Sequence, residues 1–277
     1  MAHDATVPDH TDQLTVSLTY AVNSGEMPVN EVTGPGTDSR RVAGVYEDHQ
    51  VILRNGREAR EPFDLETHGF VFVDHKTRVP DFYEESAVAE IYYPEIERLI
   101  LETTGARRVH IFDHTLRHSD KATREQRLVR EPAVSVHNDY TEWSGPQRLR
   151  DVLPDEAEDL LKRRCAIVQV WRSINTPIET IPLAMCDARS LDAGDLITTE
   201  RRSPGRIGQT YRIAYNQSQE WYWFPRMTRD EALVFKVYDS EIDSPARWTA
   251  HTAFVNPAAP ADAPPRESIE IRSFVFW

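Results

Sequence analysis

The chain has 277 residues, of which 40% are hydrophobic and 28% are charged, a composition typical of a globular protein with a substantial core. Its 32 Lys and Arg residues against 45 Asp and Glu residues give a formal net charge of −13, so nucleic acid is not an expected partner. No apolar run approaches the ~20 residues that a membrane span needs. The first residues also lack a secretory pattern, and we therefore expect a cytoplasmic protein without membrane contacts.

The two cysteines, Cys165 and Cys186, lie in no spacing that predicts structural zinc or a disulfide scaffold. We expect both thiols to be reduced. The short basic pairs Arg40–Arg41 and Arg201–Arg202 are predicted to lie in solvated loops.

The amino-terminal part of the chain alternates between polar segments and short β-type segments. Residues 1–13 are polar and acidic and predict a flexible tail. Residues 14–23 alternate apolar and polar side chains like a strand, whereas the Gly, Pro and Asn of residues 24–41 predict a loop. Further short strands are predicted at 42–46, 51–53 and 70–73. The best helical pattern spans residues 84–104, with Pro94 as the point where the helix breaks or restarts.

The carboxy-terminal part is dominated by β-type patterns. A strand at 109–112 leads into a charged segment, 117–131, that is predicted to face solvent, and an acidic start with a basic end predicts a helix at 154–164. From Cys165 on, strands are predicted at 166–171, 183–187, 211–215, 221–224, 232–238, 248–255 and 268–276. Strands of this length and spacing predict a sandwich or barrel. We therefore predict a mainly β protein with flanking helices, in which residues 14–277 form a single domain around a double-stranded β-helix (jelly-roll) core.

One pattern of metal-ligand type stands out. His137 and Asp139 are residues i and i+2 of a β-type segment, so both side chains project from one face while Asn138 points away. His251 lies on a later β segment. Two imidazoles and one carboxylate on one face of Fe(II) leave the opposite positions open for a co-substrate and O₂. A second His-x-Asp, at His10–Asp12, lies in the predicted tail and is set aside.

A basic residue with a nearby hydroxyl follows the second histidine. Arg266 and Ser268 match what the distal carboxylate of 2-oxoglutarate requires, a guanidinium fork and a hydrogen-bonding hydroxyl. Strand alternation places Arg266, Ser268, Glu270 and Arg272 on one face, so Arg272 is a rival for this role. Each of these residues also has a purely structural interpretation, as a core histidine, a turn aspartate or a surface arginine.

Other clusters are predicted to border a substrate pocket. His114 and His118 are four residues apart, but Thr115 replaces the glutamate that a zinc protease motif requires, which disfavours a zinc hydrolase. His114 and Arg117 are predicted to border the pocket instead.

The aromatic and amide-rich stretch 215–224 is more typical of core than of a binding site. A strong oxidant nevertheless needs a dry, shaped pocket, and aromatic walls provide one. Asn216 and Trp221 are therefore also predicted to contact substrate.

Several longer segments, taken together, resemble those of a known group of enzymes: FDHTLRHS, VHNDYTEWSGPQRLRD, RCAIVQVWRSINTPIETIPLAMCDARSL, YNQSQEWYWFPRMTRDEALVFKVYDS and ARWTAHTAFVNP with PPRESIEIRSFVFW. Over residues 14–277 they resemble fungal and bacterial Fe(II)- and 2-oxoglutarate-dependent oxygenases, a group that includes gibberellin desaturase-like enzymes and the cephalosporin 7α-hydroxylase component of cephamycin biosynthesis. The resemblance implies a double-stranded β-helix that uses Fe(II), 2-oxoglutarate and O₂. The metal ligands are then His137, Asp139 and His251, with Arg266 and Ser268 on 2-oxoglutarate.

The compact size resembles the bacterial antibiotic-pathway members. This implies hydroxylation of an unactivated C–H bond of a small molecule, a cephalosporin at C7, with a separate methyltransferase as partner. Desaturation or oxidative cyclisation of another natural product is the alternative within the group. Two further alternatives are a cupin-like isomerase or hydrolase that uses the metal without 2-oxoglutarate, and a non-enzymatic β-sandwich binding module.

Overall fold

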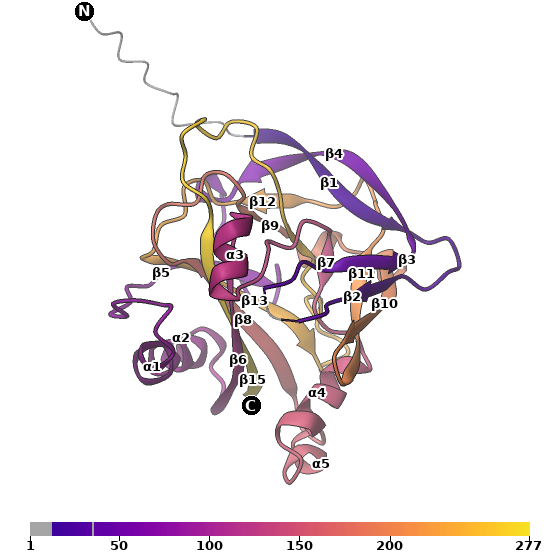
Figure 1. Ribbon diagram of the computed structural model, residues 1–277. Helices are drawn as coiled ribbons and strands as arrows, with labels where there is room; N and C mark the ends of the chain where they lie inside the picture. The colour runs from indigo at the N-terminus through magenta and orange to yellow at the C-terminus, as the bar shows by residue number, and fades with distance from the viewer. Residues whose placement is uncertain (1–12, 35) are drawn as a thin grey trace, which may run out of the picture.

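Two β-sheets packed face to face form the frame of the protein, which a computed structural model describes over residues 13–34 and 36–277 (Figure 1). The large sheet contains, in spatial order, β1 (Gln13–Val22), β4 (Val45–Asn55), β12 (Trp221–Trp223), β9 (Leu183–Cys186), β14 (His251–Ala253), β7 (His137–Asn138), β11 (Arg206–Ile213), β10 (Leu196–Ser203), β2 (Val29–Glu31) and β3 (Arg40–Ala43). The small sheet contains β5 (Phe70–Asp74), β13 (Glu231–Asp239), β8 (Cys165–Ser173), β15 (Glu267–Phe276) and β6 (Arg108–His118). This is the predicted mainly β architecture with a jelly-roll core.

The helices flank the sheets. They are α1 (Glu85–Ala87), the π-helical turn η2 (Val88–Tyr92), α2 (Tyr93–Thr104), α3 (Lys121–Arg127), α4 (Ser144–Val152) and α5 (Ala157–Leu160), with 3₁₀ turns η1 (Gly56–Glu58), η3 (Ala188–Ser190) and η4 (Ala193–Asp195). The predicted helix at 84–104 is confirmed. The π-helical turn precedes Pro94, whose ring nitrogen cannot donate a helical hydrogen bond. Within the described residues, no helix is both long and apolar enough to cross a membrane.

Apolar side chains form three clusters that match these layers. Between the sheets lie residues such as Trp171, Met185 and Phe235. On the outer face of the small sheet, α2 buries Ile96 and Ile100 against β8, β13 and β15. A third cluster covers the outer face of the large sheet, where β1 and β4 contribute. These clusters shield the space between the two sheets from solvent, so polar residues on the inner faces are buried.

Several predicted boundaries differ from the structure. Residues 1–12 of the predicted tail lie outside the described residues, and Gln13 is the first residue of β1. The strand predicted at 109–112 continues to His118, through polar residues that face other protein groups instead of solvent. The helix predicted at 154–164 is helical only over the four residues of α5, whereas α4 and β10 were not predicted at all.

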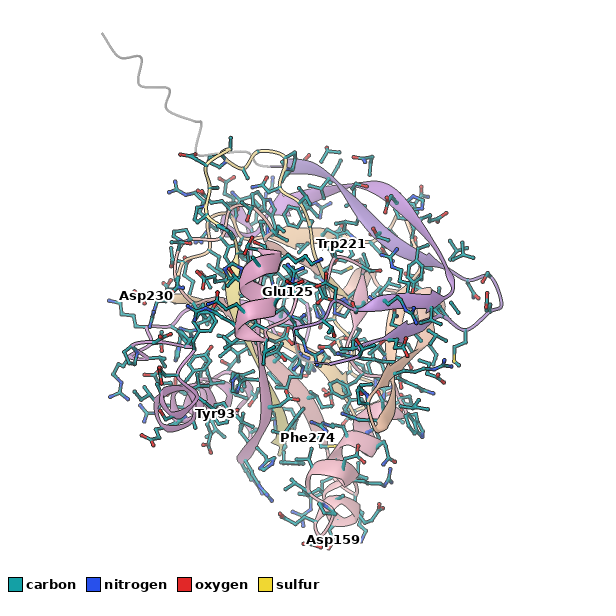
Figure 2. All side chains as sticks on the ribbon, in the orientation of Figure 1. Tyr93, Glu125, Asp159, Trp221, Asp230 and Phe274 are labelled. Atoms are coloured by element: carbon teal, nitrogen blue, oxygen red, sulfur yellow. The ribbon has the colours of Figure 1, made fainter. Side chains whose placement is uncertain are left out.

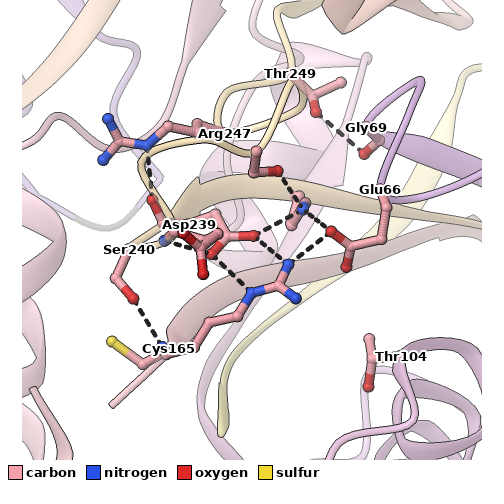
Figure 3. A network of polar contacts seen from close by, with 12 residues as sticks. Glu66, Gly69, Thr104, Cys165, Asp239, Ser240, Arg247 and Thr249 are labelled. Carbon is pink, nitrogen blue, oxygen red and sulfur yellow. Dashed lines mark hydrogen bonds and ion pairs between the residues drawn. The ribbon is translucent and has the colours of Figure 1, made fainter. Parts of the chain in front are cut away.

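A buried ion-pair network joins β13 to the start of β8 (Figure 3). The side chains of Lys236 and Asp239 are both fully buried and lie 2.8 Å apart. Arg164 pairs with Asp239 at 2.7 Å, and Glu66 contacts both Lys236 and Arg164. Burial raises the pKa of Asp239, but the hydrogen bond from Arg164 and the charge of Lys236 outweigh it, so the pKa lies below its ordinary value. The network therefore contributes fully at neutral pH and is lost as the pH falls through that lowered pKa.

Replacing Asp239 with Ala should destabilise the fold by about 3–5 kcal/mol, because Lys236 would stay buried with its main counter-ion removed. Urea denaturation at neutral pH measures this as a lower midpoint. Asp159→Ala is the matched control, since Asp159 also lies three residues from its lysine, Lys162, but in an exposed pair that should contribute less than ~1 kcal/mol. Equal midpoints for the two variants would show that the buried network does not stabilise the fold.

Candidate metal centre

Three side chains with metal-ligand atoms meet between the sheets. One ligand atom from each of His137, Asp139 and His251 lies within 4.8 Å of the others. Nε2 of His137 is 3.7 Å from Oδ1 of Asp139, and the two imidazole centroids are 4.4 Å apart. The two histidines are close because the sheet register pairs His251 on β14 directly with His137 on β7. Directly paired residues of antiparallel strands share a face, so two histidines far apart in the sequence become one cross-strand contact.

Backbone carbonyls fix both imidazoles. Nδ1 of His137 lies 2.8 Å from the carbonyl oxygen of Ser135, and Nδ1 of His251 lies 2.9 Å from that of Thr249. A backbone carbonyl oxygen can only accept a hydrogen bond, so Nδ1 carries the proton. Nε2 is left unprotonated, with a lone pair free to bind a metal. This is the orientation that metal-bound histidines show in proteins.

Charge and burial keep His137 and Asp139 in the protonation states that a metal requires. Burial lowers the pKa of His137 well below its ordinary value, and the neighbouring His251 lowers it further. Burial raises the pKa of Asp139, but Arg272, the two histidines and a hydrogen bond from Gln169 lower it well below the ordinary range. At neutral pH His137 is therefore a neutral imidazole and Asp139 an ionised carboxylate.

Neighbours on the small sheet position the carboxylate. Gln169 on β8 donates its amide N–H to Oδ2 of Asp139 at 2.6 Å, and Nε of Arg272 lies 3.7 Å from the same oxygen. Gln169 and Arg272 are directly paired across β8 and β15. Asn138 points the other way and is buried, where it donates to the carbonyl oxygens of Tyr140 and Val237. The donor set of two imidazoles and one oriented carboxylate fits Fe(II).

Arg266 is a buried cation without a counter-ion. Its guanidinium donates to Oγ of Ser268 at 3.1 Å and to the carbonyl oxygen of Ile181 at 3.0 Å, and it stacks on the ring of Trp171 at 4.9 Å. Among the described residues, no carboxylate lies within ion-pair distance of it. Burial and the positive charge of Arg117 together lower the pKa of Arg266 to about 9. Such a group is poised to bind a carboxylate from outside the protein.

The position of Arg266 suits a short dicarboxylate. Its guanidinium lies over Trp171, and Trp171 is two residues along β8 from Gln169, whose amide holds Asp139. Two residues of a strand span about 7 Å. A five-carbon dicarboxylate therefore has a length suited to reach from the metal position to Arg266.

The rival residue, Arg272, is already neutralised. It pairs with Asp113 at 3.0 Å, with Glu270 and, at longer range, with Asp139. Its pKa stays well above the ordinary value because these carboxylates outweigh the effect of burial. The predicted shared face of Arg266, Ser268, Glu270 and Arg272 matches this arrangement, and the unpaired charge favours Arg266 over Arg272 as the group that binds 2-oxoglutarate.

Two cavities reach Asp139. The larger has a volume of about 590 Å³, a size typical of small-molecule sites. His114 and Arg272 line it, and His114 also contacts the hydroxyl of Tyr93 at 2.8 Å. The smaller cavity, of about 60 Å³, is lined by His137, Asp139 and Arg117 among others. Arg266 and Ser268 line neither cavity. Two of the predicted pocket residues, His114 and Arg117, thus line cavities that reach Asp139.

The structure does not bring Asn216 and Trp221 to the metal cluster; both line a separate cavity, and their contact with substrate stays a prediction. Trp221 pairs with Cys186, whereas His251 pairs with the preceding residue, Met185. Consecutive strand residues point to opposite faces, so Trp221 packs in the outer cluster, next to β4 (Figure 2). Asn216 instead donates to Asp192 and Asp195 and stabilises a loop.

Sequence reasoning also missed residues that belong to the site. Gln169 lies in a fully buried strand, where a polar residue flanked by valines was an available signal. Arg201 was predicted to lie in a solvated loop, yet it is on β10 and lines both cavities. Arg130 also lines both cavities. Alternation along β10 directs Arg201 inward and leaves Arg202 exposed.

Comparison with known proteins adds the following. A family model described as "Oxidoreductase/YMDC permease-like domain" matches residues 18–276. Hydroxylase/desaturase CTB9 of Cercospora beticola is 34% identical over 254 residues, which cover 84% of this chain and 78% of that protein. The Fe(II)/2-oxoglutarate-dependent dioxygenase nvfI of Aspergillus novofumigatus is 33% identical over 239 residues, covering 83% and 84%. A solved structure titled as the iron and alpha-ketoglutarate-dependent endoperoxidase NvfI superposes with a TM-score of 0.83 at 29% identity, over 96% of this chain and 98% of that one.

Proposed function

Because the chain belongs to the family of Fe(II)/2-oxoglutarate-dependent hydroxylases, desaturases and endoperoxidases that includes these fungal enzymes, we propose that it oxidises a C–H bond of a small secondary metabolite held in the large cavity. In this proposal His137, Asp139 and His251 bind Fe(II), and Arg266 with Ser268 holds the distal carboxylate of 2-oxoglutarate. The observation that carries it is the convergence of three metal-ligand side chains beside a buried, unpaired guanidinium.

The protein's own residues position the reactants and exclude water. Bound Fe(II) supplies the activation of O₂, coupled to the decarboxylation of 2-oxoglutarate to succinate. The carbonyls of Ser135 and Thr249 aim the imidazoles, and Gln169 aims the carboxylate. Phe235 packs against His251 with ring centroids 4.9 Å apart and, like Trp171, closes the inner side to water. No side chain has to act as a general acid or base.

The identity of the substrate stays a prediction. The relatives described above are named as hydroxylases, desaturases and dioxygenases, and their names give no support to a cephalosporin as substrate. Hydroxylation of a cephalosporin at C7, with a methyltransferase as partner, is therefore one hypothesis to be tested against desaturation or cyclisation of other natural products.

Anaerobic titration of the protein with Fe(II) and then with 2-oxoglutarate tests the proposal. Chelation of the keto acid by the metal should produce a weak visible charge-transfer band, and admission of O₂ should yield succinate. Substrates are then found as those compounds, among β-lactams, terpenoids and polyketides, that accelerate succinate release. A non-enzymatic binding module would give no charge-transfer band. A metal-dependent isomerase would show turnover that does not depend on 2-oxoglutarate. Either result would overturn the proposal.

A further inference from the structure

Two arginines face the cavities without a partner among the described residues. The side chains of Arg130 and Arg201 line both the large and the small cavity, together with the metal ligand Asp139. Among the described residues, neither guanidinium makes a hydrogen bond or an ion pair. The two groups therefore present an uncompensated positive surface next to the metal centre.

The other arginines of the large cavity are engaged. Arg272 pairs with Asp113 and Glu270, Arg206 lies 3.6 Å from Asp151, and Arg127 stacks on the ring of Tyr83 at 3.9 Å. The large cavity also has carboxylates in its wall, but Asp113 is paired and Glu85 is exposed to solvent. Among the arginines that line the large cavity in the described part of the chain, only Arg130 and Arg201 thus have no partner.

The surroundings make these two charges unfavourable without a ligand. Burial, together with the charges of Arg201, Arg117 and Arg272, lowers the pKa of Arg130 to about 10, against a smaller opposing effect of Glu131. Burial also lowers the pKa of Arg201, with Asp139 as its main opposing charge. Asp139 is the larger of the two opposing effects, and a dication bound to it would offset its effect on Arg201. An anion between the two guanidinium groups would relieve the repulsion.

The backbone holds the pair in place before any ligand binds. Arg201 points inward from β10 because of strand alternation. Arg130 is fixed by a parallel bridge to β6, in which its N–H donates to Leu116 at 3.1 Å and its carbonyl accepts from His118 at 3.0 Å. Two guanidinium forks on a rigid frame suit the planar, two-oxygen geometry of a carboxylate.

We propose that Arg130 and Arg201 form an anion-binding subsite, and that the substrate of this enzyme carries a carboxylate which the pair binds. The subsite orients the substrate so that its apolar remainder fills the 590 Å³ cavity beside the metal. That the bound anion is the enzyme's substrate rests on the proposed function. The binding of an anion by Arg130 and Arg201 does not depend on it. In an acidic protein, such an interior basic pair selects acids over their neutral esters and amides.

Benzoate and benzamide are suitable probes, because they share a shape and differ in charge. Each is titrated calorimetrically into the protein loaded anaerobically with Fe(II) and 2-oxoglutarate, for the wild type, the single variants R130Q and R201Q, and the double variant. R206Q is the matched control, since Arg206 lines the same cavity but has its own partner. We expect the wild type and R206Q to bind benzoate and not benzamide. Each single variant should bind benzoate about tenfold more weakly, which corresponds to one lost charge-assisted hydrogen bond.

Three results would overturn the inference. The first is equal binding of benzoate and benzamide by the wild type, and the second is benzoate binding that survives in the double variant. The third is loss of the 2-oxoglutarate band in the double variant together with its retention in R266A, which would assign the pair to 2-oxoglutarate. Absence of the band in the wild type would instead refute the proposed function, while the benzoate titration would still report on the subsite. The unfolding midpoint of each variant identifies any that fail to fold.

Discussion

Replacing Asp139 with Asn should abolish Fe(II)-dependent succinate formation and weaken Fe(II) binding by at least about 100-fold. Loss of a residue that only hydrogen-bonds to a metal ligand already costs roughly 10–100-fold, and this substitution removes the charge of the ligand itself. The new side chain is nearly isosteric, so the contacts around Gln169 and Arg272 should largely persist. Anaerobic titration of the visible band against Fe(II) at saturating 2-oxoglutarate measures the change.

Asp113→Asn is the control for this prediction. Asp113 is also a carboxylate that pairs with Arg272 and lines the large cavity, but it is not one of the three clustered ligand residues. The Fe(II) affinity of D113N should stay near that of the wild type. If D139N bound Fe(II) as well as D113N does, the metal centre would have to lie elsewhere.

Replacing Arg266 with Ala should weaken 2-oxoglutarate binding by about 100-fold or more, at unchanged Fe(II) affinity. The guanidinium would contribute two charge-assisted hydrogen bonds to the distal carboxylate, each of roughly 1.5–3 kcal/mol. R266K should recover part of the loss, because lysine keeps the charge but lacks the planar fork. The dependence of the band on 2-oxoglutarate concentration at saturating Fe(II) provides the measurement.

Arg272→Gln separates the two candidate arginines. Because Arg272 is already paired with Asp113 and Glu270, its loss should change the affinity for 2-oxoglutarate only a few-fold, although it removes a neighbour of Asp139. A large loss of 2-oxoglutarate affinity in R272Q, with little loss in R266A, would reverse the assignment.

The local sequence predicted features that depend on neighbouring residues alone. The i and i+2 spacing of His137 and Asp139, with Asn138 directed away, follows from the geometry of extended chain. The helix over 84–104 follows from its apolar periodicity and ends at Gly105, whose φ of 65° suits a residue without a side chain. The shared face of Arg266, Ser268 and their neighbours on β15 follows from alternation.

Features that depend on register between distant strands could not be predicted from the sequence. Trp221 was predicted to contact substrate, and the sequence could not show that pairing with Cys186 instead of Met185 directs it away from the metal cluster; a one-residue difference in register decides this. The basic pair Arg201–Arg202 resembled a solvated loop because nothing nearby indicates that one of the two faces a cavity.

By itself, the sequence determined the residue types available for ligation, their spacing along each strand and the mainly β class of the fold. The tertiary structure alone decided that His251 lies opposite His137, that Arg272 is neutralised while Arg266 is not, and that Arg130 and Arg201 meet at the cavity. The physical reason is that strand pairing and counter-ion balance are set by residues far apart in the chain, so charge compensation is defined only once the sheets have packed.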